Sequence, residues 1–156
     1  MSTRTIEAAP VRKSIRVRAA QARAFEVFTA RFDAWWPKSH HIGKAAMKEA
    51  VIETCVGGRW YEKDEDGAEC EWGRVLAYDP PARIVLSWHI NSKFVLDATV
   101  ASEVEVRFIP DGAEGTLVEL EHRIIASDAD AIRAAVDSPG GWGALLELFG
   151  QSAASD

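Results

Sequence analysis

The segment GGRWYEKDEDGAECEWGRVLAYDPPARIVLSW, residues 57–88, decides the fold of this chain. Turn signals interrupt it at Gly57-Gly58, at Asp66-Gly67 and at the Asp79-Pro80-Pro81 corner. Glycine tolerates the positive φ of tight hairpins, and proline cannot donate a hydrogen bond to a strand ladder, so each signal predicts a break between strands. Together with the apolar run before it, the segment predicts an antiparallel meander with strands at residues 50–56, 59–64, 69–78 and 83–90.

The same segment is rich in tryptophan. Trp60, Trp72 and Trp88 fall on three of the predicted strands, and the whole chain contains six tryptophans. Aromatic side chains bury large areas and also stack on planar ligands. One such ring usually belongs to the core, but six are more than a core of this size usually holds. We therefore expect several of them to line a cavity, provided that the strand register turns them inward.

Apolar periodicity extends the sheet in both directions and adds helices. The additional predicted strands are 11–18, 101–109 and 116–125, and the predicted helices are 21–31, a short turn at 33–37, 128–136 and a last helix that begins near Gly141. In the last helix, Trp142, Leu145 and Phe149 form one apolar face, which must be buried against the sheet. The predicted fold is α+β, a curved antiparallel sheet of about seven strands wrapped around a C-terminal helix, with two short helices after the first strand.

Length and composition are typical of one globular domain. The 156 residues suffice for a sizeable core, and we expect a single domain at 11–151 between flexible segments at 1–10 and 152–156. A net charge of −6 argues against nucleic acid or an acidic membrane surface as a partner. The absence of a signal peptide and of a membrane span predicts a cytoplasmic protein, and its two cysteines, Cys55 and Cys70, are expected to be free thiols.

Several short motifs follow one another in order over residues 11–150. They are Ala24-Phe25-x-x-Phe28-Thr29 with Trp35-Trp36-Pro37; Gly57-Gly58-Arg59-Trp60-x-Glu62; Trp72-Gly73-x-Val75 with Asp79-Pro80-Pro81; Thr116 to His122; and Gly141-Trp142-x-x-Leu145. In this order they resemble the helix-grip proteins of the START/Bet-v-one-like superfamily, also called SRPBCC. Within it, the match is to the domains named for the activator of the heat-shock chaperone ATPase. The superfamily includes lipid carriers, hormone receptors, polyketide cyclases and co-chaperone domains, so the resemblance implies a fold and leaves the function open.

The candidate pocket residues combine all the tryptophans with two polar side chains. They are Trp35, Trp36, Trp60, Glu62, Trp72, Trp88, His122 and Trp142. Strand alternation puts Glu62 on the same face as Trp60, and His122 on the same face as Val118 and other apolar residues. An inward carboxylate and imidazole would orient a ligand or act as acid and base. The alternative interpretation is a histidine bonded to a backbone carbonyl and a glutamate at the rim, and we also place Trp35 at the rim.

Metal and cofactor sites are not expected. His40-His41, taken with Cys55 and Cys70, lacks the ligand spacing of structural zinc sites. The chain also contains no phosphate-binding loop, dinucleotide fingerprint or nucleophile elbow.

The function expected from these observations is non-catalytic binding of a small apolar or aromatic molecule, in a monomer or a homodimer. Two alternatives remain open. One is a co-chaperone-like protein-interaction module, and the other is a cyclase- or hydrolase-like enzyme that uses His122 and Glu62. A continuous void above about 300 Å³ favours a ligand site. A strongly shifted pKa on either polar residue favours an enzyme.

Overall fold

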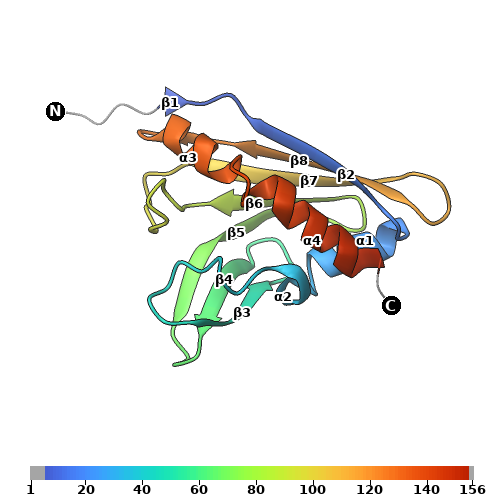
Figure 1. Ribbon diagram of the computed structural model, residues 1–156, viewed down its shortest axis with the longest axis horizontal. Helices are drawn as coiled ribbons and strands as arrows, with labels where there is room; N and C mark the ends of the chain where they lie inside the picture. Colours follow the sequence, from blue (N-terminus) through green and yellow to red (C-terminus); the bar gives the residue numbers. More distant parts are fainter. Residues whose placement is uncertain (1–5, 155–156) are drawn as a thin grey trace.

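A computed structural model describes residues 6–154 of the chain (Figure 1). Its strands are β1 (Ile6–Glu7), β2 (Val11–Val17), β3 (Met47–Ile52), β4 (Arg59–Asp64), β5 (Glu69–Asp79), β6 (Arg83–Trp88), β7 (Ser102–Pro110), β8 (Thr116–Arg123) and β9 (Ile125–Ala126). Its helices are α1 (Gln21–Phe28), α2 (Phe32–Trp35), α3 (Ala129–Val136) and α4 (Trp142–Ala154).

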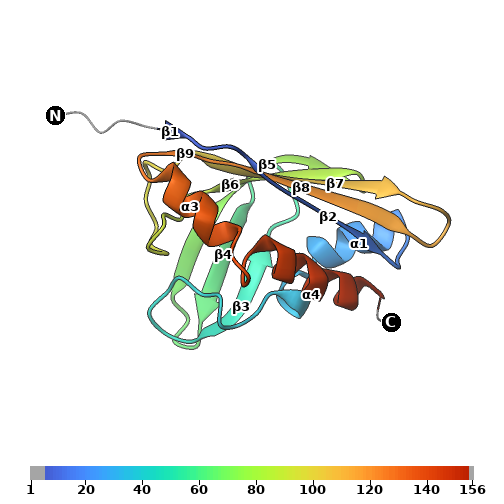
Figure 2. The same cartoon turned by 45° about the horizontal axis from the view of Figure 1, so that its top comes forward.

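The main sheet has seven antiparallel strands in the order β2-β8-β7-β6-β5-β4-β3, and β1 pairs separately with β9. The sheet curls so that β3 and β4 turn toward the helices (Figures 1 and 2). Along β8 the side chains alternate, with Val118, Leu120 and His122 buried and Glu119 exposed. The predicted helix-grip architecture is confirmed, because this curled sheet surrounds the C-terminal helix.

The predicted meander corresponds to β3 to β6, and its tight curvature depends on a glycine. A Cβ atom added at Gly73 would lie 1.9 Å from the carbonyl oxygen of Ser87, so only glycine permits this approach of β5 to β6. The register shifts at Trp60/Tyr61 and at Val75/Ala77 flank the same point, and such irregularities increase strand bending. The bend brings the β4 and β5 side chains over the concave face.

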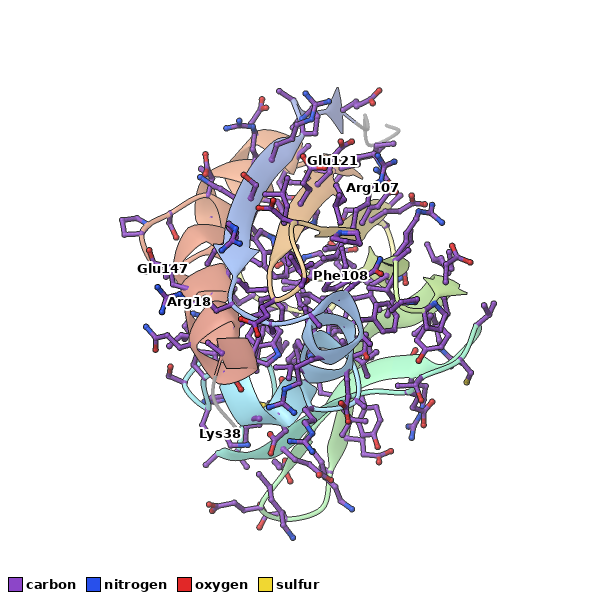
Figure 3. The ribbon with its side chains drawn as sticks, turned by 90° about the vertical axis from the view of Figure 1, so that its right-hand side faces the viewer. Arg18, Lys38, Arg107, Phe108, Glu121 and Glu147 are labelled. Carbon is purple, nitrogen blue, oxygen red and sulfur yellow. The ribbon has the colours of Figure 1, made fainter. Side chains whose placement is uncertain are left out.

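Helix α4 lies against that concave face. Trp142, Leu145 and Phe149 are buried, and the Phe149 ring lies 5.3 Å from the Phe28 ring of α1, centroid to centroid. Glu147 projects on the opposite side, away from the sheet, whereas Phe108 of β7 lies in the interior (Figure 3). The predicted apolar face is thus the one that the sheet grips.

Several element boundaries differ from the sequence prediction. The first strand of the meander is β3 at Met47–Ile52 and not 50–56, because residues 53–58 form a loop in which Gly57 has a φ of 83°. Helix α1 ends at Phe28, short of residue 31. Residues 91–99, which no periodicity assigned, form a loop whose Leu96 bridges back to Ile90, the residue before the loop.

The segments expected to be flexible, 1–10 and 152–156, include residues that belong to secondary structure. Ile6–Glu7 pair with Ile125–Ala126, and α4 continues to Ala154. The remainder of those segments, residues 1–5 and 155–156, lies outside the described residues. No helix within residues 6–154 has the length and apolar character needed to span a membrane. Cys55 and Cys70 are free, as predicted.

Candidate functional site

A cavity of about 450 Å³ lies between the concave face of the sheet and the start of α4. Its wall includes Trp36 after α2, Trp72 of β5, Trp88 of β6 and Trp142 of α4. Residues 39–42, the end of α3, the connection from α3 to α4, Leu145 of α4 and Phe94 of the 91–99 loop also line it. We call this space the aromatic cavity.

The four lining tryptophans present apolar ring surface to the cavity because each indole N–H is already bonded to protein. The acceptors are the His40 carbonyl for Trp36 (3.0 Å), Glu62 Oε1 for Trp72 (3.0 Å), the Ile90 carbonyl for Trp88 (3.0 Å) and His122 Nδ1 for Trp142 (3.0 Å). The rings also contact one another, with centroid distances of 5.3 Å for Trp36–Trp72 and 5.9 Å for Trp88–Trp142. The wall is therefore both apolar and held in place by hydrogen bonds.

The other two tryptophans lie behind this wall. Trp60 is fully buried, and its ring contacts Trp72 and Trp88 at centroid distances of 5.4 Å each. The sequence analysis placed Trp35 at the rim of the pocket. In the structure it packs in the core against Phe28 and Phe149 and donates its indole N–H to the Val27 carbonyl. The difference arises because α2 turns Trp35 toward α4 and leaves the next residue, Trp36, to face the cavity.

His122 is completely buried behind Trp88 and Trp142. Burial lowers the pKa of His122 from its ordinary value of 6.5 to about 3, so the ring is neutral at neutral pH. Its Nδ1 accepts the Trp142 N–H, which requires Nε2 to carry the ring proton. That Nε2–H has no partner within residues 6–154.

Glu62 of β4 is also buried, at the base of the loop that precedes β3. Its Oε1 accepts hydrogen bonds from the Ile42 backbone N–H at 2.5 Å and from Trp72 Nε1 at 3.0 Å. Its Oε2 has no partner among the described residues. A Cβ atom added at Gly43 would lie 3.3 Å from this Oε2, so the free oxygen is beside the loop that lines the cavity. Glu62 therefore positions the cavity wall at residues 39–42.

Residues that sequence reasoning did not assign to the site form its mouth. His40 Nε2 lies 3.0 Å from the Gly140 carbonyl and so joins the 39–42 segment to the connection before α4. Phe94 lines the cavity, is 56% exposed, and has a φ of 59°, which is uncommon for a residue other than glycine. The proximity of His40 to Trp36 in sequence was the available signal, whereas nothing in the pattern of 91–99 indicated Phe94.

Two other hollows each include several charged side chains in their lining. One, of about 270 Å³, lies on the outer face of β2, β7 and β8, beside Glu105. The three guanidinium groups of Arg83, Arg123 and Arg107 lower the pKa of Glu105 to about 2 against the opposing effect of its burial. The other, of about 750 Å³, adjoins Arg16 and the β7–β8 loop. Within residues 6–154, no cluster of three His, Cys, Asp or Glu side chains could hold a metal ion.

A sequence model of the family described as "Activator of Hsp90 ATPase homolog 1-like protein" matches residues 18–152. A search of curated proteins found no match.

Solved structures include two relatives above 30% identity. One, named as the anthrahydroquino-gama-pyrone synthase Txn09 complexed with SUM, is 41% identical, with 93% of this chain and 97% of that chain covered and a TM-score of 0.62. The self-sacrificing resistance protein CalC from Micromonospora echinospora is 32% identical, with 92% and 93% covered and a TM-score of 0.68. CalU16 from the same organism is 24% identical, with 96% and 86% covered and a TM-score of 0.58, and shows the fold alone.

Proposed function

Because the chain belongs to the family of Activator of Hsp90 ATPase homolog 1-like proteins, we propose that it binds one small, mostly apolar or aromatic molecule in the aromatic cavity. The observation that carries this proposal is a cavity of about 450 Å³ walled by four tryptophans. Ligand sites for small molecules occupy roughly 300–1,000 Å³ and are predominantly apolar and aromatic. A ligand of about two or three fused rings fits such a volume.

The chemistry of the wall favours a flat ligand. Trp36 and Trp72 meet at an interplanar angle of 45°, and Trp88 and Trp142 meet at 57°. Offset and tilted rings of this kind present faces and edges on which a third ring can stack. The relationship to Txn09, whose name indicates a polycyclic aromatic product, supports the same class of ligand.

The site favours ligand binding without catalysis over a cyclase- or hydrolase-like enzyme, although Txn09 is named as a synthase. The strong pKa shift of His122 meets the criterion that favours an enzyme, but its direction does not suit acid–base work. A histidine with a pKa of about 3 is not a general acid at neutral pH, and it is a weak base. Its Nδ1 lone pair is moreover occupied by Trp142 Nε1–H. His122 is suited to donating a hydrogen bond, not to transferring a proton.

Titration with anthracene, followed by quenching of tryptophan fluorescence, tests the proposal. The wild-type protein should show blue-shifted emission that iodide barely quenches, because all six tryptophans are buried, and saturable quenching by anthracene at one site. Trp88→Leu should weaken binding about tenfold through lost stacking and burial. Leu76→Ala is the matched control, because Leu76 is exposed on β5 and does not line the cavity.

Shielded emission without saturable quenching would overturn the proposal and favour the protein-interaction module. Equal weakening by Trp88→Leu and Leu76→Ala would place the bound probe outside the aromatic cavity. Turnover of the bound aromatic molecule, lost in a His122 variant that still binds it, would favour the enzyme.

A further inference from the structure

We propose that the aromatic cavity has an inner polar subsite behind Trp72 and Trp88, which selects ligands that carry both a hydroxyl and a carbonyl group on the flat ring system. This inference rests on the proposed function, because it specifies the ligand class of the same site. The subsite consists of Trp60, Glu62 and His122.

The first observation is that three buried polar atoms have no hydrogen-bond partner within residues 6–154. They are Trp60 Nε1, Glu62 Oε2 and His122 Nε2, and the three side chains are 0%, 1% and 0% exposed. A buried donor or acceptor that is left unpaired destabilises the fold, whereas an apolar side chain of similar shape would not. Unpaired buried groups therefore suggest a role beyond packing.

The second observation is the hydrogen-bonding character of the three atoms. Trp60 Nε1 carries a hydrogen and is only a donor. His122 Nε2 is a donor too, because His122 Nδ1 accepts from Trp142 and the ring is neutral. Both hydrogen bonds to the Glu62 carboxyl group go to Oε1, so the lone pairs of Oε2 are available to accept one. The set therefore offers donors to a ligand carbonyl and an acceptor to a ligand hydroxyl.

The third observation is the position of these groups relative to the cavity. Glu62 is hydrogen-bonded to the lining residue Trp72, and Trp60 and His122 each contact the lining residue Trp88, at centroid distances of 5.4 Å and 5.1 Å. Trp88 is the most exposed of the six tryptophans, at 8%, and one hydrogen bond, to the Ile90 carbonyl, holds its indole. A ring that enters the cavity reaches the polar groups when the Trp88 indole tilts aside.

A comparison of two probes with the same three-ring outline tests the subsite. Anthracene is apolar, and 1,8-dihydroxyanthraquinone adds the hydroxyl and carbonyl groups. We expect the wild-type protein to bind the oxygenated probe at least tenfold more tightly. Glu62→Gln, which replaces the accepting oxygen by an amide group of the same shape, should weaken binding of the oxygenated probe at least about tenfold more than it weakens binding of anthracene.

Leu145→Val is the matched control, because Leu145 lines the cavity and has no polar group. It should weaken both probes by the same factor. If Glu62→Gln does not fold, the wild-type protein still tests the inference through the indole N–H resonance of Trp60, identified with Trp60→Phe. That resonance should move to the frequency of a hydrogen-bonded N–H with the oxygenated probe only.

Equal affinities for the two probes, or a Trp60 N–H resonance that responds identically to both, would overturn the inner subsite while the proposed function stands. Failure of both probes to bind would overturn the proposed function as well.

Discussion

Replacing Trp142 by phenylalanine removes one hydrogen bond and keeps an aromatic ring at the start of α4. Trp142 is 2% exposed, and its indole N–H donates a hydrogen bond to His122 Nδ1 at 3.0 Å. Without it, Nδ1 of a fully buried histidine has no donor, which costs about 1–3 kcal/mol of unfolding free energy. Truncation to alanine also removes the ring and leaves a cavity, so Trp142→Ala should cost about 3–5 kcal/mol.

Urea unfolding followed by far-UV circular dichroism measures both changes without relying on tryptophan emission. In thermal unfolding of a chain of this length, each 1 kcal/mol of lost unfolding free energy corresponds to a fall of about 2–4 °C in Tm. Glu147→Ala is the control on the same helix, because Glu147 is exposed, and it should remain within about 0.5 kcal/mol of wild type. Wild-type stability of Trp142→Phe would refute the reasoning, since it would mean that this hydrogen bond does not hold α4 on the sheet.

Three further changes have distinct signatures. Lowering the pH from 6.5 to 4.5 should reduce the free energy of unfolding by up to about 1.4 kcal/mol per pH unit, because burial lowers the pKa of His122 to about 3 and only the unfolded chain binds the extra proton. Urea titrations of His122→Gln over the same pH range should lose this dependence, and a dependence that persists would assign it to another group. Gly73→Ala should prevent stable folding, because its Cβ would lie 1.9 Å from a backbone oxygen of β6. Gly143→Ala, whose Cβ meets open space, should raise the free energy of unfolding in a urea titration by about 0.4–1 kcal/mol, and the same sign for both variants would contradict the close approach of β5 and β6. Burial raises the pKa of Cys70 to about 11, so iodoacetamide at pH 8 should label the exposed Cys55 first in the native protein. Equal labelling rates for the two cysteines, measured by mass spectrometry of peptides, would contradict the burial of Cys70.

The sheet and its terminal helix were predictable because their signals are local. The period-two alternation of β8 and the turn residues at Asp66-Gly67 and Asp79-Pro80-Pro81 each act within a few residues of chain. The apolar face of α4 is likewise encoded by the spacing of its own residues. Boundaries such as the end of β3 at Ile52 were missed, because the paired strand β4, and not local propensity, decides where the ladder stops.

Site residues were predictable only as a set of inward-facing side chains. Alternation along β4 and β8 placed Glu62 and His122 inside, and both are buried. It did not reveal that Glu62 supports residues 39–42 or that Trp142 is bonded to His122, since these contacts join segments 20 residues apart. Trp35 and Trp36 show the limit most clearly, because adjacent tryptophans have different surroundings, one in the core and one in the cavity wall.

The sequence alone therefore determined which segments form the main strands and helices and which faces are apolar, because strand and helix periodicities repeat over neighbouring residues. Tertiary structure alone decided where the cavity remains. The curl at Gly73, the seating of α4 and the bond from His40 to Gly140, which spans 100 residues, together leave the aromatic cavity unfilled. A cavity is the volume that packed side chains from distant segments do not occupy, so no single stretch of sequence encodes it.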